Sequence, residues 1–483
     1  MAERLEKKEA RLATVYSGVM LPMTIPHQSP RRQSGVWLFL MLIGLGQTLC
    51  GDSAPRPDVI VSSLKELVEV ADGRNQVIRM KPGTYRLSEL ATKRWIRQQR
   101  KEGRSRFMEL KGSGNRYLMQ DVVIEWETEL RSEMRAPTHT GELVVTGDRN
   151  VFSGLTIKCT GHGVSRGGQL VELRGRGNVL EDCYFEIKGS SPYGYGDVFG
   201  KGGEAVIGHY KHSAIRVAGD DSRLLNCKVL MRSFGHGIFL QDDAANVLIE
   251  NCQVVGEMRK TEEMLAERKG RPFERDFQMV FRTREGSNRL LPGYMKSLCE
   301  DGFRTYGQHP GLVLRGCRAK NVRGGFEIRS EAGAIIENCS AIGCERGFWV
   351  SSGARLRNCR ADAQYGPALF LEGEEASVEL EILPQVSDRK VHGLAMIHGQ
   401  GHEVILKAGL GGERRRAVPI WIGYSAPARG DGMASFGEKR ARRLDIRNRT
   451  RMPVRVGERV DGLSLETLGP VEENKGRGVQ LNK

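Results

Sequence analysis

Hydrophobic and polar residues alternate in a phrase that recurs five times between Ile215 and Cys359. Each copy contains a short strand with apolar residues at alternate positions, a polar turn, and a second short strand that ends at a cysteine. The closing cysteines are Cys227, Cys252, Cys317, Cys339 and Cys359, and the last two intervals are 22 and 20 residues. Such a period is typical of a solenoid whose coils need neighbours to bury their apolar sides. The pattern predicts a parallel β-helix.

The alternation also predicts which side chains face outward. In one copy, Phe326 and Ile328 fall on the inner face, and Glu327 and Arg329 fall on the outer face. The same register predicts an inner stack of Ile215, Ile238, Phe303, Phe326 and Phe348. It predicts two outer rows, one of Arg216, Phe239, Arg304, Glu327 and Trp349, the other of Ala218, Gln241, Tyr306, Arg329 and Ser351. We expect these rows to form the working surface.

The first 50 residues are predicted to be a leader with a signal peptide. Arg31 and Arg32 precede an apolar run at residues 36–45, which is short for a membrane span and suits a signal peptide. The leader is long, so Met20 or Met23 is an alternative start. We expect a secreted or periplasmic protein with no stable membrane span after signal removal. Lipid attachment at Cys50 is a minor alternative.

The β-helix is expected over residues 58–471, with insertions near 86–142, 188–212 and 257–300 and a frayed tail at 472–483. At its start, Ser62 or Ser63 can cap a short amphipathic helix, which precedes an apolar strand and a Pro82-Gly83 turn. This beginning, with the repeats, resembles right-handed parallel β-helix proteins of the pectin-lyase-like superfamily. The resemblance spans roughly residues 58–471 and matches no specific enzyme family. It implies an all-β, right-handed parallel β-helix closed by an N-terminal capping helix.

Ten cysteines in an exported chain would ordinarily suggest disulfides. Here the five closing cysteines and Cys183 end equivalent strands, and Leu155 takes the same place one coil earlier. Parallel stacked side chains have poor disulfide geometry, and a thiol packs well as a small hydrophobe. We therefore expect free, buried cysteines.

The chain carries 74 basic and 59 acidic residues, a formal net charge of +15. A basic surface attracts polyanions, although the charge has an alternative role in keeping a long solenoid soluble. No zinc finger, helix-turn-helix or ribonucleoprotein motif is present, which argues against nucleic acid as the partner. The expected partner is an acidic polysaccharide, bound by a monomer.

Three residues are candidates for catalysis: Arg304, His236 and Glu327. Eliminating a uronate requires a base and a group that neutralises the carboxylate. Polysaccharide lyases of the superfamily supply such groups from adjacent coils, and by that resemblance Arg304 is either the base or the carboxylate clamp. The alternative is an inert surface pair of Arg304 with Glu327. His236 stands in a Gly-His-Gly phrase similar to that of polygalacturonase-like glycosidases, but the companion motifs of that family are missing.

Candidate substrate-binding residues come from the outer rows and the 188–212 insertion. Aromatic rings can stack on sugar faces, and cationic or imidazole groups can bind hydroxyls and carboxylates. The alternative for the insertion is that its aromatic residues only pack the loop. The candidates are Arg216, Tyr306, Arg329, Trp349, Lys201, His209 and His212.

Asp242 and Asp243 are candidate calcium ligands, because calcium prefers several oxygen donors. Aspartates at a tight turn more often bond their own backbone. No other cofactor is indicated, and calcium is expected only if these residues converge.

The sequence therefore predicts an exported β-helix protein acting on a polysaccharide. The sharpest form of the hypothesis is a lyase that cleaves an acidic, uronate-containing glycan by β-elimination. The first alternative is a non-catalytic carbohydrate-binding or cell-envelope protein. The second is a glycoside hydrolase or uronate epimerase. A fold alone does not choose among them.

Overall fold

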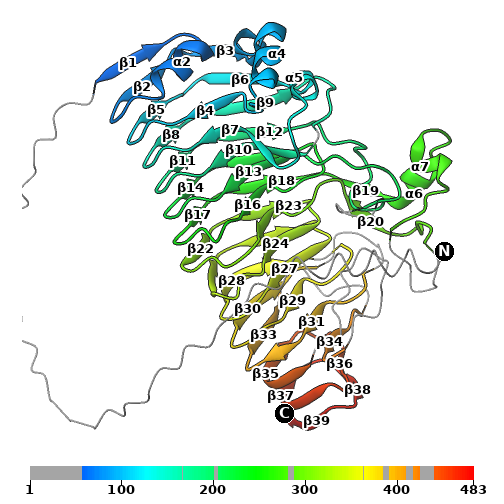
Figure 1. Cartoon of the computed structure of the whole chain (residues 1–483). Coiled ribbons are helices and arrows are strands. Elements are labelled where there is room, and N and C mark those ends of the chain that lie inside the picture. Colours follow the sequence, from blue (N-terminus) through cyan, green and yellow to red (C-terminus); the bar gives the residue numbers. More distant parts are fainter. Residues whose placement is uncertain are drawn as a thin grey trace, which may run out of the picture. The chain divides into compact units, whose positions relative to one another are not determined.

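A computed structural model describes residues 57–482 of the chain, apart from residues 166, 201–204, 281–287, 363, 385–390, 410–416 and 425–439. The chain winds through three columns of parallel strands, and each turn of the chain adds one strand to a column (Figure 1). The leader and the signal peptide predicted within residues 1–50 lie outside the described residues. No helix in the described part of the chain is long and apolar enough to span a membrane.

The first column carries the predicted outer rows and forms a sheet of thirteen strands. Its members are β4 (Met108–Leu110), β7 (Thr140–Val145), β10 (Gly168–Leu173), β13 (Ser213–Val217), β16 (Ile238–Leu240), β21 (Phe303–Thr305), β24 (Gly324–Ile328), β27 (Arg346–Val350), β29 (Leu369–Leu371), β31 (Ala395–Ile397), β34 (Ile420–Ile422), β36 (Val454–Val456) and β38 (Val471–Asn474).

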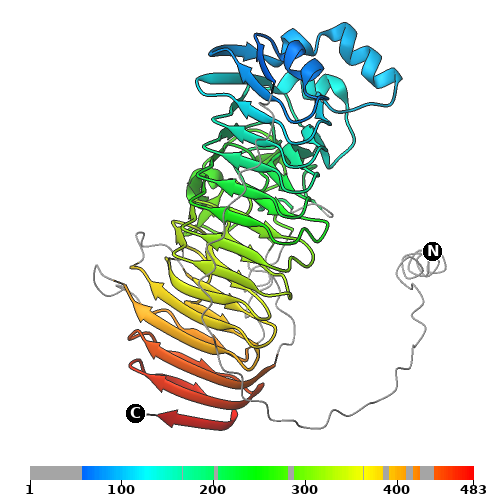
Figure 2. The same cartoon turned by 90° about the vertical axis from the view of Figure 1, so that its left-hand side faces the viewer.

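The second column runs the full length of the stack, from β1 to β39 (Figure 2). Its members are β1 (Asp58–Val61), β2 (Val77–Met80), β5 (Arg116–Leu118), β8 (Val151–Ser153), β11 (Val179–Glu181), β14 (Arg223–Leu225), β17 (Leu248–Glu250), β22 (Leu312–Arg315), β25 (Ala334–Glu337), β28 (Arg355–Ala361), β30 (Ser377–Ile382), β33 (Glu403–Ala408), β35 (Ala441–Arg449), β37 (Val460–Thr467) and β39 (Arg477–Asn482). The two-residue strand β32 (Gly399–Gln400) pairs with β35.

The third column joins the second at β28, which pairs with β25 and β26. Its other members are β3 (Gly83–Arg86), β6 (Val122–Glu127), β9 (Thr156–Thr160), β12 (Tyr184–Ile187), β15 (Lys228–Met231), β18 (Gln253–Val255), β23 (Arg318–Lys320) and β26 (Ser340–Ile342). The strands of all three columns pair in parallel, as stacked coils require.

The core lies between the columns and follows the predicted register. Phe303, Phe326 and Phe348 stack with ring centroids 4.7 Å apart and planes within 7° of each other. This spacing matches the roughly 4.8 Å between neighbouring strands. Each closing cysteine is buried, and the nine cysteines of the described residues are free thiols, as predicted; Cys50 lies outside them.

The backbone conformation of the residue before each closing cysteine explains why asparagine recurs at that position. Asn226, Asn251, Asn338 and Asn358 have φ between 51° and 56°, and Gly316 has φ 63°. Among side-chain-bearing residues, asparagine tolerates this left-handed turn best, and glycine adopts it without steric cost. Asn251 Nδ2 also donates to Asn226 Oδ1 of the preceding coil at 3.3 Å. The phrase therefore encodes a repeated corner.

The N-terminal cap forms where the sequence predicted it. Helix α2 (Leu64–Val70) begins after Ser63, whose hydroxyl accepts a hydrogen bond from the Glu66 amide at 3.1 Å. Leu64 and Leu67 are buried against the first coils. Three further helices follow near this end: α3 (Leu87–Leu90), α4 (Lys93–Lys101) and α5 (Thr128–Met134).

Two expectations differ from the structure. The segment 86–142 does not leave the stack, because it contributes β4, β5, β6 and β7 between its helices. The segment 472–482 is not frayed, since β39 pairs in parallel with β37 and completes a further coil. The strands in both segments lack the cysteine phrase, so the pattern that marked the other coils was missing.

The other two insertions project from the stack beside the first column. Residues 188–212 connect β12 to β13. The described part of 257–300 contains an antiparallel pair, β19 (Met258–Lys260) with β20 (Met295–Ser297), and helices α6 (Thr261–Leu265) and α7 (Arg271–Glu274), which project to one side in Figure 1.

Candidate active site

The outer row of the first column has the predicted register. Arg216 pairs with Phe239, Phe239 with Arg304, Arg304 with Glu327, and Glu327 with Trp349. The row is not an open surface, however, because Glu327 is 2% exposed and Arg304 9% exposed. Side chains of the two insertions contact the charged groups beside this row, so much of it is shielded from water.

A network of charged side chains occupies this shielded zone. It contains five carboxylates and five cations, together with His236: Asp197, Glu300, Asp301, Glu327 and Glu345 with Lys211, Lys296, Arg304, Arg323 and Arg346. The two signs balance, as buried charges require. All but Lys211 have side chains less than 12% exposed.

Asp301 is the central carboxylate. Its oxygens lie 3.0 Å and 3.2 Å from Arg323 nitrogens and 3.3 Å from His236 Nδ1. Arg304 and Arg346 lie further away, at 3.7 Å and 3.8 Å, and both also bond Glu327. These contacts hold three arginines and one imidazole in fixed positions above strands β21, β24 and β27.

Lys296 links the 257–300 insertion to the stack through two ion pairs. Its ammonium lies 2.9 Å from Asp197 of the other insertion and 2.8 Å from Glu345, which immediately precedes β27. The Ser297 amide also donates to Glu345, at 2.5 Å. Breaking a buried pair of this kind typically costs about 3–5 kcal/mol. Both insertions are therefore held over the first column.

The network lowers the pKa of two of its carboxylates, Glu300 and Asp301. Burial alone would raise the pKa of Glu300, but His236, Lys211 and Arg323 together lower it to about 2. For Asp301, burial is likewise outweighed, and Arg323 and His236 hold the pKa well below its usual range. Burial lowers the pKa of the Arg304 guanidinium, although Asp301 opposes the change. An arginine starts so high that it still stays charged near neutral pH.

Tyr306 connects this network to solvent. It is 39% exposed, and its hydroxyl lies 2.8 Å from His236 Nε2. The Arg304 guanidinium lies 4.7 Å from the centre of the phenol ring. Burial raises the pKa of Tyr306, so the phenol keeps its proton at neutral pH. A chain of polar contacts thus runs from the surface phenol through His236 to the buried Asp301.

Arg329 supplies a more accessible cation one coil further on. Its side chain is 40% exposed, and its guanidinium lies 4.3 Å from the centre of the Trp349 ring. Trp349 is itself held by a 2.8 Å hydrogen bond from Nε1 to Glu372. The tryptophan is 5% exposed and serves as a platform for Arg329 rather than as an open stacking face.

The other predicted binding residues make different contacts. Arg216 bonds Glu172 at 2.9 Å and also Asp242. His212 is 1% exposed and lies 3.0 Å from Glu142, which removes it from any surface role. His209 stacks on Phe234 with ring centroids 4.3 Å apart. Lys201 lies outside the described residues.

Asp242 and Asp243 both adopt the left-handed conformation, with φ of 59° and 54°. Asp243 Oδ1 accepts a hydrogen bond from the Gln308 amide at 2.6 Å, and Asp242 binds Arg216. In the described part of the chain, no three His, Cys, Asp or Glu residues are grouped to hold a metal. Calcium binding by these aspartates remains a prediction.

Sequence reasoning named only three members of the network as candidates, His236, Arg304 and Glu327. Glu300, Asp301, Arg323 and Arg346 are among those it missed. Both arginines lie just before a copy of the phrase, but Arg346 pairs with Gly324, so Arg323 and Arg346 occupy different positions of the register. Glu300 and Asp301 end an insertion and follow no period. Their contacts depend on how that insertion folds back.

Residues 294–384 match the family model described as "Right handed beta helix region". The match agrees with the parallel columns, and the chain folds as a right-handed parallel β-helix. No curated protein matches the sequence.

Several solved structures are similar in fold. A PL6 alginate lyase in complex with a trisaccharide is 11% identical, with 87% of each chain covered and a TM-score of 0.43. The catalytic domain of a GH87 α-1,3-glucanase with bound tetrasaccharides is 9% identical, with 89% of this chain and 68% of that chain covered and a TM-score of 0.45. The A-module of a mannuronan C-5 epimerase from Azotobacter vinelandii is also 9% identical, with 86% and 93% covered and a TM-score of 0.39.

Proposed function

We propose that this protein acts on a polysaccharide, and that it is a lyase cleaving a uronate-containing glycan by β-elimination. The observation that carries the proposal is the exposed Tyr306 phenol, bonded to His236 at 2.8 Å and backed by a carboxylate at 3.3 Å. A surface phenol joined to a buried imidazole and carboxylate is an arrangement suited to moving a proton. The net charge of +15 favours an acidic polymer.

Tyr306 is the proposed base and acid. Its proton passes to His236, and the phenolate oxygen takes the proton from the carbon that bears the uronate carboxylate. The released electron pair forms a carbon–carbon double bond, and the adjacent glycosidic C–O bond breaks. The Tyr306 phenol then returns a proton to the leaving oxygen, and His236 is neutral again once it gives its proton back to Tyr306. Asp301 stabilises the imidazolium in between, as the carboxylate of a catalytic triad does.

Arg329 is the proposed partner of the substrate carboxylate. Its guanidinium is fixed over Trp349 and remains 40% exposed. A cation beside the carboxylate stabilises the negative charge that develops when the neighbouring proton is removed. Arginine suits this role because its planar fork binds a carboxylate through two hydrogen bonds.

Arg304 and Glu327, expected to be catalytic, take positioning roles in this proposal. Glu327 is bound by both Arg304 and Arg346 and is 2% exposed, so it has no access to a glycan. Arg304 lies against the Tyr306 ring, where its charge favours the phenolate.

The alternatives differ in what they require. Hydrolysis needs two carboxyl groups that reach the glycosidic bond, whereas Glu300, Asp301 and Glu327 have side chains at most 3% exposed and bound to cations. Uronate epimerisation shares the proton removal and differs only in the fate of the intermediate. A carbohydrate-binding or envelope protein would use the same surface without chemistry.

The proposal includes a secreted or periplasmic location, which rests on the apolar run at residues 36–45 that is typical of a signal peptide. Calcium at Asp242 and Asp243 belongs to it as an optional cofactor.

The test is to incubate the purified protein with alginate, pectate and chondroitin, with and without calcium. Ultraviolet absorbance reports unsaturated uronate ends, and a reducing-end assay reports cleavage of any kind. A rise in both for one acidic glycan is expected, with the absorbance lost in His236→Asn. Reducing ends without absorbance would indicate hydrolysis. No signal in either assay, with glycan binding retained, would favour a non-catalytic carbohydrate-binding protein.

A further inference from the structure

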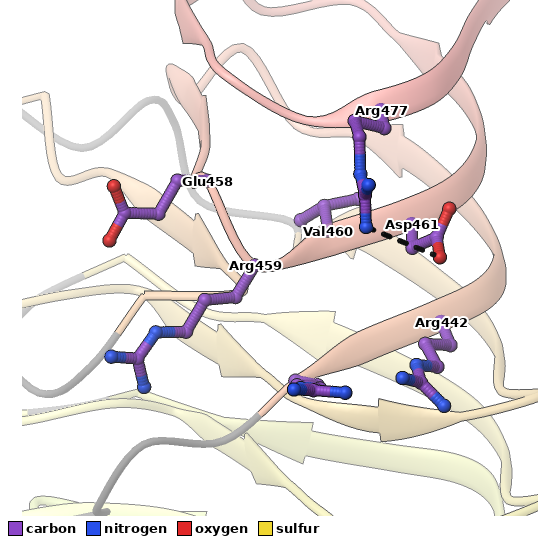
Figure 3. A pocket seen from close by; sticks show the side chains of 7 residues that line it. Arg442, Glu458, Arg459, Val460, Asp461 and Arg477 are labelled. Atoms are coloured by element: carbon purple, nitrogen blue, oxygen red, sulfur yellow. Dashed lines mark ion pairs between the residues drawn. The ribbon is translucent and has the colours of Figure 1, made fainter.

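A polar pocket lies on the second column, near the C-terminal end of the stack. Its volume is about 300 Å³, and it is lined by Arg440, Arg442, Glu458, Arg459, Val460, Asp461 and Arg477 (Figure 3). Four of these seven residues are arginines, and the one apolar member, Val460, is 1% exposed. The pocket therefore offers charge and almost no apolar surface.

The arginines meet because strands β35, β37 and β39 stack in register. Arg442 pairs with Asp461, and Asp461 with Arg477, so these side chains follow one another at successive strands. Neighbouring strands lie about 4.8 Å apart. Arg440 and Arg459 each come just before a strand of the same column, β35 and β37. The fold thus gathers like charges at one place.

The carboxylates at the pocket do not neutralise it. Asp461 lies 3.8 Å from Arg477, and both side chains are more than half exposed, so the pair is weak. The Glu458 side chain points away from that pair in Figure 3. Among the described residues, neither Arg440 nor Arg442 forms an ion pair.

We propose that this pocket is an anion-binding site that takes an oxyanion group, separate from the Tyr306 site. Arginine stays charged at all ordinary pH values and presents several donors in one plane, which match the oxygens of a carboxylate, sulfate or phosphate. The lining has no aromatic ring on which a sugar face would stack. Recognition is therefore by charge. The bound oxyanion is either a carboxylate group of an acidic polymer or a free inorganic anion.

The inference does not depend on the lyase activity, because the pocket is on the second column and Tyr306 follows a strand of the first. The two sites are separable by mutation. Arg440→Gln with Arg442→Gln removes two pocket charges. Arg94→Gln with Arg97→Gln removes two exposed charges from α4, outside the pocket, and is the matched control.

The experiment is isothermal titration calorimetry at constant ionic strength, with sulfate, phosphate, a galacturonate hexamer and neutral maltohexaose as probes. We expect the wild type and the control variant to bind an anionic probe with the same Kd. In the Arg440/Arg442 variant, the Kd for that probe should rise about tenfold or more. Hexamer binding at this site identifies the polymer as the source, and binding of sulfate or phosphate alone identifies a free anion. Arg329→Gln should leave the site intact, so failure of the lyase proposal would not mimic failure here.

Two results would overturn the inference. One is the same Kd and stoichiometry for every anionic probe in the wild type and the Arg440/Arg442 variant, with equal melting temperatures. The other is equal loss of maltohexaose binding in that variant, since a neutral sugar would not need the two charges.

Discussion

Tyr306 is the residue through which the buried charges beside β21 reach solvent. Its ring is packed against Arg304, and its hydroxyl is bonded to His236. Every other member of the proposed proton path is buried. The phenol therefore determines whether this part of the first column is a reactive surface or only a stable one.

Replacing Tyr306 by phenylalanine removes one hydroxyl and keeps the ring. Because that hydroxyl is the proposed proton carrier, we expect kcat on the cleaved glycan to fall by about 10²–10⁴-fold, with little change in melting temperature. Tyr184→Phe, on β12, is the control and should keep the wild-type rate. Wild-type kcat in Tyr306→Phe would exclude the phenol from the reaction.

Glu327 is expected to affect folding rather than chemistry. Glu327→Gln removes the charge shared by Arg304 and Arg346. Leaving buried cations without their partner costs about 3–5 kcal/mol, which denaturant unfolding would measure. Glu337→Gln, which removes a partly exposed partner of Arg315, should cost about 1 kcal/mol or less. Equal losses in the two variants would contradict the buried network.

The lowered pKa of Glu300 predicts that acid reduces the stability of the fold. Its folded pKa of about 2 lies below the ordinary glutamate value of about 4.3. The charged form therefore stabilises the fold fully above that ordinary value, and the contribution is lost as the pH falls toward 2. The stability difference between wild type and Glu300→Gln should shrink as the pH falls below about 4. A difference that stays constant down to pH 2 would contradict the assignment.

Alternation along the strands was enough to place Arg304, Tyr306 and Glu327 on the same outer face, but it did not place His236 there. It did not indicate that Glu327 would be buried, because burial depends on how Arg304 and Arg346 of the neighbouring coils close over it. Nor did it place Asp301, whose role depends on a contact with Arg323, 22 residues later. Side-chain alternation fixes direction, whereas burial depends on tertiary packing.

At the scale of elements, the closing cysteine and the residue before it define each coil. Cys252 is buried, and its thiol lies 3.3 Å from the Leu224 carbonyl oxygen of the preceding coil. Asn251 makes the left-handed corner before it. Where this pair of residues is present, the sequence predicted the strands. Where it is absent, as at β5 or β39, the pattern predicts an insertion or a tail, whereas the structure has strands.

Thiol labelling tests this packing. The nine cysteines of the described residues are buried, and burial raises the pKa of Cys299 to about 12. Since the thiolate is the reactive form, we expect iodoacetamide to leave all nine unmodified in the native protein at pH 7 and to modify all nine in denaturant. Peptide mass spectrometry reads out each site. Rapid native labelling of Cys252 or Cys317 would contradict a closed interior.

At the scale of the whole β-helix, a regular stack carries two insertions that turn one stretch of one column into a specialised surface. The coils supply the rows, and Lys296 and Lys211 of the insertions add charges that complete the network. The regular part was predictable because each coil repeats its neighbour. The specialised part was not, since its geometry depends on single contacts between distant segments.

The central claim is cleavage by elimination, and product analysis in water enriched in oxygen-18 tests it most directly. Wild-type protein would digest the most responsive acidic glycan, and mass spectrometry would determine the mass and isotope content of the fragments. Elimination predicts new non-reducing ends that have lost the elements of water, with no oxygen-18 incorporated by bond cleavage. Oxygen-18 at newly formed reducing ends, with saturated partner fragments, would show hydrolysis and contradict the account.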